Sequence, residues 1–479
     1  MRSGPTSCRP YPTRPRTART WEIRDVLSLA RAHHAAGNYG EGLRLAKLGL
    51  VRSTGGFEPV RAEAMYETGV LAVSTGDLEG GAEYIEQAYL AAEGRKHDRL
   101  AAAAAVRLVS IYGRHLVQRE RAREWARRSE VAIERLTDTT KHRAALEYNL
   151  GLLEHAEGSL DLARDHFQAA LVLYEERGDV RDARVCRMSL GVIEEMKGES
   201  ETALALFKEA FSGARTSLGL EHPDTATALA AVAGAQTSLG QLQVARENLE
   251  SALGVFERTH GPEHHTVAST LSNVGTVAFD LGDYDQALIH HERALAIYEE
   301  TLPEGHPRTA TTIGNIADAH SAKGAHEVAR DGYARALDML RERLDPQSPQ
   351  LAHVHANLGL ALAKLERYEE SAAQFDKAWT IVRSSTSEAD RAFVLYRRAL
   401  ARRHAGQRPL DDVRRALSGF EQGRSMPRIA EAKFELAKLL VQEDGPRALE
   451  EAREALTTFR SMGADRRADP VQTWIDEHE

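Results

Sequence analysis

The amino-acid sequence predicts an all-α solenoid of antiparallel helix pairs, and two observations carry that prediction. The first is an internal repeat with a period of 42 residues, seen in Asn273-Val274-Gly275, Asn315-Ile316-Ala317 and Asn357-Leu358-Gly359. The second is a set of small residues that returns at fixed offsets within each repeat. No proline interrupts either half of the repeating unit. A constant period of this length is typical of stacked helical hairpins.

Small side chains mark the places where the helices of each unit are expected to cross. Six consecutive units have three such positions, separated by 12 and then 7 residues: Gly151/Ala163/Ala170, Gly191/Ala203/Ala210, Ala233/Ala245/Ala252, Gly275/Ala287/Ala294, Ala317/Ala329/Ala336 and Gly359/Ser371/Ala378. Antiparallel helices approach closely only where the facing side chains are short. Thirteen of these 18 positions are alanine, in a chain of 479 residues with 74 alanines. We expect all 18 to be buried between helices.

Turn and cap residues fit the same units. A glycine ends the first helix in five of them, and Glu366 interrupts the series: Gly158, Gly198, Gly240, Gly282 and Gly324. Glycine adopts the left-handed conformation of a helix C-cap at low cost. A histidine stands at the corresponding helix start in three linkers, His222-Pro223, His264-His265 and His306-Pro307. A polar residue at a helix start explains these histidines, so they are interpreted as structural. Adjacent pairs such as His290-His291 cannot both chelate a metal from one helix, because neighbouring helical residues point about 100° apart, and no metal is expected.

The motif within each unit resembles the tetratricopeptide repeat. Gly275…Gly282-Asp283-Tyr284…Ala287…Ala294 matches its pattern well, and the 42-residue spacing with His-Pro-x-Thr-Ala linkers resembles the kinesin-light-chain type. This resemblance implies a superhelical solenoid of about eleven antiparallel helix pairs. Its expected parts are a disordered Arg/Pro-rich tail (1–20), degenerate N-terminal units (21–143), a regular block (144–382) and degenerate C-terminal units with a cap (383–479).

The whole arrangement also resembles the repeat region that follows the catalytic domain of some bacterial serine/threonine kinases. The segments that carry this resemblance are Glu130-Val131-Ala132-Ile133-Glu134-Arg135-Leu136 and Val471-Gln472-Thr473-Trp474-Ile475-Asp476. The kinase motifs themselves, a glycine-rich loop, His-Arg-Asp and Asp-Phe-Gly, do not occur. The implied alternative function is the sensor or regulatory half of a kinase or transcription regulator whose catalytic or DNA-binding domain is missing from this chain.

Motifs and composition exclude several function classes. No Gly-x-x-x-x-Gly-Lys loop, Gly-x-Ser-x-Gly elbow or His-Glu-x-x-His pair occurs, so neither catalytic residues nor a cofactor are expected. The longest apolar run, Leu100–Val106, is far shorter than the roughly 20 residues of a membrane span. Two cysteines and the lack of an apolar leader favour the cytoplasm. A net charge of −9 argues against nucleic acid, and two basic segments, 95–143 and 397–415, are interpreted as solvated helix faces.

Four asparagines stand two residues before the first small position of a unit: Asn149, Asn273, Asn315 and Asn357. Asparagine is a mediocre helix former, so its recurrence at one register requires a reason. The family resemblance implies that the first helices line a concave groove, where such an asparagine commonly contacts a bound peptide. Its amide can both donate to and accept from a peptide backbone. The alternatives are that the amides tie neighbouring first helices to one another or merely solvate the groove.

Three further side chains complete the candidate peptide groove. Thr276 and Asp318 lie one residue past the small position, and Lys364 lies about a turn further along its helix. Co-chaperone versions of the fold hold a C-terminal carboxylate with Lys or Arg beside the asparagine. That ligand class is not expected here, because the corresponding positions are Tyr148, Ser272, Gly314 and Ala356. We therefore predict a non-catalytic interaction module or scaffold that binds a peptide segment of a partner protein, with a neighbouring kinase or regulator as partner under the alternative.

Overall fold

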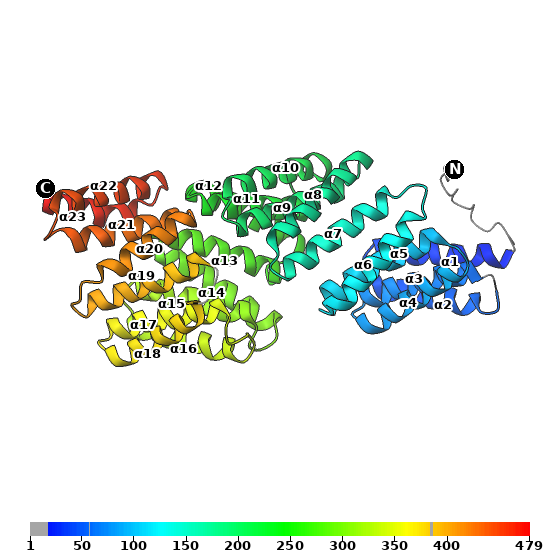
Figure 1. Ribbon diagram of the computed structural model, residues 1–479, viewed down its shortest axis with the longest axis horizontal. Helices are drawn as coiled ribbons and strands as arrows, with labels where there is room; N and C mark the ends of the chain where they lie inside the picture. Colours follow the sequence, from blue (N-terminus) through cyan, green and yellow to red (C-terminus); the bar gives the residue numbers. More distant parts are fainter. Residues whose placement is uncertain (1–17, 57, 384–386) are drawn as a thin grey trace, which may run out of the picture. The chain divides into compact units, whose positions relative to one another are not determined.

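The computed structural model describes residues 18–56, 58–383 and 387–479. Within those ranges the chain forms 23 α-helices, one five-residue π-helix and no β-strand (Figure 1). Their contacts divide the chain into two compact units, Met1–Lys197 and Gly198–Glu479. This division falls inside the predicted regular block 144–382. Each hairpin packs mainly against the next one, so a regular sequence pattern does not by itself define a compact unit.

Unit 1 contains nine α-helices and the π-helix. Their bounds are α1 Ala18–Ala35, α2 Tyr39–Ser53, α3 Glu58–Ser74, α4 Leu78–Gly94, α5 Asp98–Ser110, the π-helix Ile111–His115, α6 Arg119–Glu134, α7 Thr140–Ala156, α8 Leu160–Arg177 and α9 Val180–Met196. Helix α1 begins at Ala18, so its first three residues are helical although they belong to the expected disordered tail (1–20). The rest of that prediction lies outside the described residues.

Unit 2 contains the remaining fourteen α-helices of the described chain. Their bounds are α10 Ser200–Leu218, α11 Pro223–Ser238, α12 Leu242–His260, α13 His265–Asp280, α14 Tyr284–Thr301, α15 Pro307–Ala322, α16 His326–Arg341, α17 Pro349–Lys364, α18 Tyr368–Val382, α19 Glu388–His404, α20 Leu410–Gln422, α21 Met426–Leu440, α22 Gly445–Ser461 and α23 Asp465–His478. Most of these helices pack mainly against the ones before and after them, but α19 packs more closely against α17 than against α18. The predicted all-α solenoid of about eleven helix pairs is confirmed.

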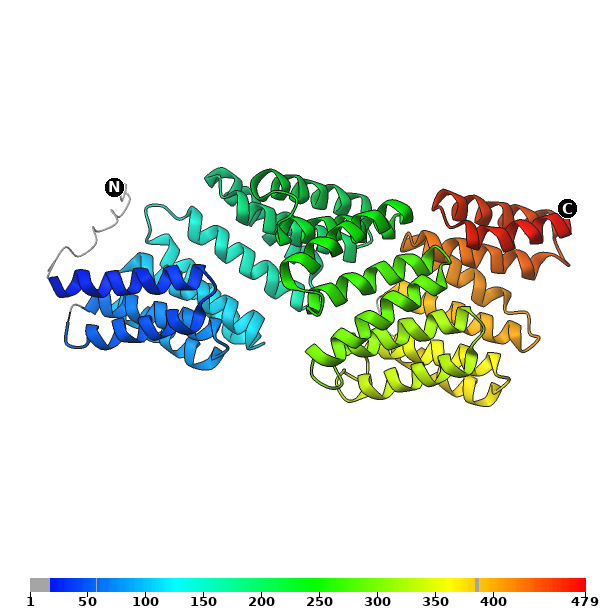
Figure 2. The same ribbon diagram turned by 180° about the vertical axis from the view of Figure 1, so that it is seen from behind.

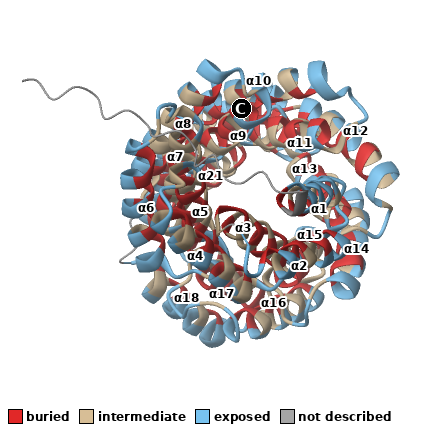
Figure 3. Ribbon diagram, turned by 90° about the vertical axis from the view of Figure 1, so that its right-hand side faces the viewer, coloured by how far each residue is buried: buried red, intermediate tan, exposed pale blue. Residues whose placement is uncertain are grey.

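The helices of unit 2 lie in two layers. Figure 3 shows α10, α12, α14, α16 and α18 on the outside and α11, α13 and α15 on the inside. Helices α11, α13, α15, α17 and α19 also contact one another in that order, and we call them the inner layer. These are the first helices of their pairs, which the resemblance expected to line the concave side. Side chains that leave the inner layer toward the centre of unit 2 are therefore the candidates for binding.

All 18 predicted small positions are buried. At three of them a methyl group would collide with the side chain 16 residues further on. A Cβ added at Gly151 would lie 2.7 Å from the ring of Phe167, and one at Gly359 would lie 2.9 Å from the ring of Phe375. At Gly275 the ring is that of His291, which is 1% exposed, and burial lowers its pKa to about 4. His291 therefore takes the place of a core aromatic residue.

The predicted turns and caps form as expected. All five turn glycines have a positive φ, and Glu366, which interrupts the series, adopts the same left-handed conformation with φ 61°. The three linker histidines cap α11, α13 and α15, because the Nδ1 atom of each accepts a hydrogen bond from the backbone N–H two residues on. The distances are 3.1 Å for His222, 3.2 Å for His264 and 3.1 Å for His306. Their role in the described structure is that of a helix cap.

The last helices of unit 2 pack back onto its early ones. Gln243 of α12 donates through Nε2 to the carbonyl of Gly463 at 3.4 Å, and Arg466 of α23 forms a 2.7 Å ion pair with Asp283. A Cβ added at Gly240 would lie 2.9 Å from Cγ of Met462, which shows how closely the two parts approach. One buried apolar cluster includes residues of α11–α13 and of α21–α23. Unit 2 thus closes on itself, as α12, α13 and α21–α23 show in Figures 1 and 2.

Candidate functional site on the inner helices

The structure places six of the seven predicted site residues in unit 2. Asn273 and Thr276 lie on α13, Asn315 and Asp318 on α15, and Asn357 and Lys364 on α17. The seventh, Asn149, lies on α7 in unit 1. The six residues share three successive helices of the inner layer because the 42-residue repeat returns the same helix face at each step.

Asp318 is the centre of a polar network, in which two hydrogen bonds and one ion pair join four helices. Its carboxylate accepts from the hydroxyl of Tyr333 at 2.6 Å and from Nδ2 of Asn357 at 3.2 Å. A terminal nitrogen of Arg397, on α19, lies 3.9 Å from the same carboxylate oxygen. Burial raises the pKa of Asp318, and Arg397 and Tyr333 oppose that rise. Two predicted site residues, Asp318 and Asn357, are thus in direct contact.

The four asparagines of the predicted register divide into two classes. Asn149 donates to the carbonyl of Val106 at 3.4 Å and so joins α7 to α5, as Asn357 joins α17 to α15. These two amides tie neighbouring first helices together, which is the first of the two alternative interpretations. Asn273 is exposed and Asn315 is half-buried, and the side-chain amide of neither residue forms a hydrogen bond with a described residue. Thr276, also exposed, donates to the carbonyl of Ser272 in its own helix.

Two arginines that the sequence prediction did not assign to the site lie near Asp318: Arg397 is within ion-pair distance, and Arg428 is near enough to lower its pKa. Arg397 was interpreted as part of a solvated basic run, and that interpretation is wrong for this residue: its side chain is 24% exposed. Its guanidinium carbon lies 5.0 Å from the ring centroid of Phe393, and the guanidinium carbon of Arg428 on α21 lies 5.0 Å from the same centroid. One feature of the sequence could have assigned Arg397 to the site. It stands two residues before the small residue Ala399, and each of the four asparagines also stands two residues before a small residue.

The other arginines of that run lie on different faces. Arg398 and Arg402 form ion pairs with Asp412 at 2.9 and 3.2 Å, and Arg403 pairs with Glu435. Adjacent residues on a helix point about 100° apart, so Arg398 turns away from the side that Arg397 occupies. This part of the predicted solvated face therefore consists of ion pairs between helices together with one inward-facing arginine, whereas Arg414 and Arg415 are exposed on α20.

Lys364 and Arg428 are half-buried cations without an acidic partner. Neither forms an ion pair or a hydrogen bond with a residue in the described part of the chain. Burial and the charge of Arg397 lower the pKa of both groups. Asp390, which lies near enough for Arg428 to lower its pKa, pairs with His353 at 2.9 Å instead.

A second charged group lies where α13, α21 and α23 meet. Arg467 of α23 forms an ion pair with Glu431 of α21, and their attraction raises the pKa of Arg467 despite burial. Asp280, at the end of α13, has no hydrogen-bond or ion-pair partner among the described residues. Burial raises its pKa to about 6, although Arg467 opposes the rise. Asp280 is thus poorly solvated, and no ion pair or hydrogen bond with a described residue stabilises its negative charge.

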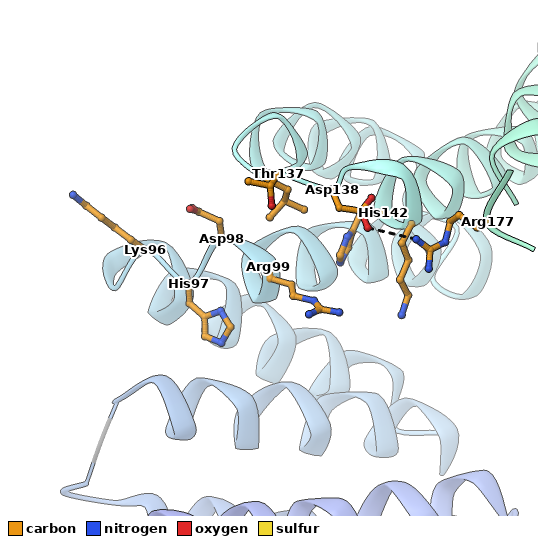
Figure 4. Close-up of a pocket in the computed structure, with 10 residues that line it drawn as sticks. Lys96, His97, Asp98, Arg99, Thr137, Asp138, His142 and Arg177 are labelled. Atoms are coloured by element: carbon orange, nitrogen blue, oxygen red, sulfur yellow. Dashed lines mark ion pairs between the residues drawn. The ribbon is translucent and has the colours of Figure 1, made fainter. Parts of the chain in front are cut away.

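Unit 1 contains a separate pocket of about 340 Å³, shown in Figure 4. It lies between the starts of α5 and α7, and its lining residues are Lys96, His97, Asp98, Arg99, Leu136, Thr137, Asp138, Lys141, His142 and Arg177. Lys96, Arg99 and Lys141 are exposed, and Arg177 lies 3.6 Å from Asp138. Elsewhere in the basic segment 95–143, arginines bridge helices, as in the 2.8 Å ion pair of Arg121 with Glu86. Exposed basic side chains and ion pairs of this kind are typical of a solvated surface.

The described residues contain no group of three or more His, Cys, Asp or Glu side chains that could hold a metal ion. Among the described helices, none is both long and apolar enough to cross a membrane.

Comparisons with known proteins agree with this architecture. The family model described as "Tetratricopeptide repeat" matches residues 142–216, 184–258, 224–300, 266–342 and 308–384, and a second model of the same description matches residues 27–97. The first of these models alone matches more than half of the chain. No curated protein sequence matches the chain.

Solved structures similar to this chain have low sequence identity. The kinesin-light-chain TPR-like repeats of Podosopora anserina are 20% identical, with a TM-score of 0.36, over 42% of this chain and 96% of theirs. BtubC (BKLC) from P. vanneervenii is 24% identical, with a TM-score of 0.37, over 50% and 89%. The Rap conjugation gene regulator of the plasmid pLS20, solved with the Phr* peptide, is 14% identical, with a TM-score of 0.51, over 76% and 97%. The chain belongs to the tetratricopeptide repeat family, whose repeats form protein–protein interaction scaffolds.

Proposed function

We propose that this chain is a non-catalytic cytoplasmic scaffold that binds an extended peptide segment of a partner protein along the inner layer of unit 2. The observation that carries the proposal is the pair of amides of Asn273 and Asn315. They stand at one register on successive helices, 42 residues apart, and neither has a hydrogen-bond partner among the described residues. Each amide can pair with both the N–H and the C=O of an extended backbone without requiring a particular side chain.

The fold comparison supports a peptide as the ligand class. The Rap regulator of pLS20 was solved with the Phr* peptide, and it shares the fold with this chain over 76% of the chain's length. A chain of this fold can therefore hold a peptide. The alternative, in which the chain is the sensor half of a kinase or transcription regulator, would make such a peptide the input of a separate catalytic or DNA-binding partner.

The experiment that tests the proposal is affinity selection from a synthetic library of random octapeptides, with the retained peptides counted by mass spectrometry after gel filtration. The decisive variant is the double substitution Asn273→Ala with Asn315→Ala. Since neither amide bonds to a described residue, the variant is expected to melt within about 0.5 kcal/mol of wild type and to retain no peptide above background.

The matched control removes three exposed acids from the outer helices α14 and α18: Glu292→Ala, Glu300→Ala and Asp376→Ala. This control is expected to retain peptides as the wild type does. If the asparagine variant keeps full peptide retention, or if the wild-type chain retains no peptide at all, the proposal is wrong.

A further inference from the structure

We propose that the pocket of unit 1 binds the phosphate group of a small phosphorylated molecule whose remaining part is polar, such as a sugar phosphate. The pocket has a volume of about 340 Å³ and lies between the starts of α5 and α7 (Figure 4). Small-molecule sites range from about 300 to 1,000 Å³, so this pocket has room for more than the anion alone. The inference does not depend on the proposed function, which concerns unit 2.

Basic side chains from three helices meet beside His142. They are Arg99 of α5, Lys141 of α7 and Arg177 of α8. Burial lowers the pKa of His142, and the charges of these three side chains lower it further, so all three lie close to its ring. Asp138 opposes the decrease without reversing it. In Figure 4 the guanidinium of Arg99 extends toward His142. The pocket is therefore electropositive where these side chains meet.

Both acids that line the pocket already have partners. Asp98 lies 3.3 Å from Arg135, which is not part of the lining, and Asp138 lies 3.6 Å from Arg177. Asp138 also accepts a hydrogen bond from the backbone N–H of Thr140 at 3.2 Å. Neither acid therefore balances the other basic side chains of the pocket.

Three basic side chains of the lining have no acidic partner. Lys96, Arg99 and Lys141 form no ion pair with any residue in the described ranges. Arg177, by contrast, pairs with Asp138 and, at 2.9 Å, with Asp179. A phosphate group on a hydroxyl carries a charge of about −1.5 to −2 at pH 7. Such a group would therefore supply the negative charge that the described acids do not.

The starts of α5 and α7 add backbone donors. The N-cap residues of these helices, His97 and Thr139, form no side-chain cap. The backbone N–H groups of Arg99 and His142, in the first turns, have no acceptor among the described residues. Such N–H groups point out of the helix start, where the helix dipole also favours an anion, and they are common phosphate ligands.

The ring of His142 offers a further donor. Its Nδ1 atom is buried and has no hydrogen-bond partner in the part of the chain that the structure describes. A buried polar atom without a partner costs free energy, and a phosphate oxygen would supply the missing acceptor. Solvated surfaces also have exposed cations. The buried ring nitrogen and the two uncapped helix starts distinguish this pocket from such a surface.

The composition of the lining indicates the rest of the ligand. Of the ten described residues that line the pocket, only Leu136 has a wholly apolar side chain, and none is the Phe, Tyr or Trp on which a nucleobase would stack. Thr137 and the carboxylates of Asp98 and Asp138 can form hydrogen bonds with hydroxyl groups. A hydroxylated body therefore fits the lining better than a nucleobase does.

Isothermal titration calorimetry of the full chain at pH 7.5 and low salt tests the proposal. The probes are three phosphate esters: glycerol 3-phosphate, ribose 5-phosphate and glucose 6-phosphate. At least one ester is expected to bind with a Kd of about 1 mM or tighter. Inorganic phosphate should bind at least tenfold more weakly, because it leaves most of the pocket empty. Glycerol, ribose and glucose, which have no phosphate, should give no heat of binding.

Three results would overturn the inference. The first is that none of the esters binds. The second is equal affinity for inorganic phosphate, which would identify the free anion as the ligand. The third is tighter binding of an eight-nucleotide oligothymidylate than of any ester, which would identify a nucleic acid as the partner. Peptide retention by unit 2 would be unaffected in each case, so these results are distinguishable from failure of the proposed function.

Variants then assign the binding to the pocket. Arg99→Gln and Lys141→Gln are each expected to weaken binding of the preferred ester about tenfold or more, with unchanged helicity by circular dichroism. The matched control is Arg127→Gln, which removes an exposed arginine of α6 that does not line the pocket. This control should bind the ester as the wild type does. Full affinity in Arg99→Gln, or an equal loss in Arg127→Gln, would contradict the assignment.

Discussion

The side-chain amide of Asn357 donates to the carboxylate of Asp318 over 3.2 Å, and this bond joins two successive helices of the inner layer. Asn357, which was predicted to contact a ligand, therefore already uses its amide N–H group to hold two helices together. Its Oδ1 atom is buried and finds no hydrogen-bond partner in the described ranges. The three asparagines of unit 2 are thus not equivalent, and their substitution by alanine should have different consequences.

Asn357→Ala should lower the free energy of unfolding by about 1–3 kcal/mol, because it removes a hydrogen bond to a charged group. Asn315→Ala, at the same register of α15, breaks no hydrogen bond to a described residue and should change stability by less than about 0.5 kcal/mol. Urea denaturation followed by circular dichroism measures both. Equal effects of the two substitutions would show that the Asn357–Asp318 bond does not contribute to stability.

Gly359→Ala should destabilise unit 2, because the new Cβ would lie 2.9 Å from the ring of Phe375. Overpacking of this kind costs about 1–3 kcal/mol. The control is Gly314→Ala in α15, where a Cβ meets nothing within 4 Å. That change should stabilise the helix by roughly 0.5–1 kcal/mol, since alanine loses less backbone entropy than glycine. Differential scanning calorimetry of the two variants should give melting shifts of opposite sign, and shifts of the same sign would contradict the packing described here.

Asp280→Asn should stabilise the chain at neutral pH and not in acid. The folded state raises the pKa of Asp280 from 3.8 to about 6, so it holds this proton more tightly than the unfolded state. Stability is therefore lost as pH rises from about 4 to about 6, and the cost is complete above that range. A shift of two units corresponds to at most about 3 kcal/mol. Urea midpoints at pH 7.5 and pH 4 test this, with the exposed Asp376→Asn as control; an unchanged midpoint at pH 7.5 would contradict the stated burial.

His306→Ala should cost about 0.5–2 kcal/mol by removing the acceptor that caps α15. The Nδ1 atom of His306 accepts from the backbone N–H of Arg308 at 3.1 Å. His306→Asn, which keeps an acceptor at the N-cap, should regain most of the loss. Thermal melts of the two variants measure the difference. If asparagine fails to rescue the alanine variant, the histidine has another role.

Much of the fold could be predicted because each unit depends on local chemistry. The 18 small positions recur at spacings that only close helix crossing requires, and all 18 are buried. The turn after α17 is instructive, because Glu366 adopts the left-handed conformation that glycine provides elsewhere. The packing of the neighbouring helices therefore holds Glu366 in a backbone conformation that glutamate rarely adopts. By contrast, no sequence signal was found for the return of α21–α23 onto α11–α13, which depends on contacts between distant parts of the chain.

The candidate site was only partly predictable. The repeat placed Asn273, Asn315, Asn357 and Asp318 on one face, since a fixed period preserves the face. It could not show which amides are already bonded, because this depends on the neighbouring helix. Arg397 was missed because the arginines that follow one another in the sequence were treated as one surface. Successive residues of a helix point about 100° apart, so these arginines lie on different faces. Arg428 lies in a degenerate unit, where no regular spacing indicated its neighbours.

Photo-crosslinking tests the central claim, peptide binding along the inner layer, most directly. The photoreactive residue p-benzoylphenylalanine replaces either Thr276, which is exposed on the inner helix α13, or Glu292, which is exposed on the outer helix α14. Each chain is irradiated with the peptides that the wild type retains, and the adducts are quantified by mass spectrometry. The account predicts adducts at position 276 and none above background at position 292. Equal crosslinking at both positions, or crosslinking at position 292 alone, would contradict it.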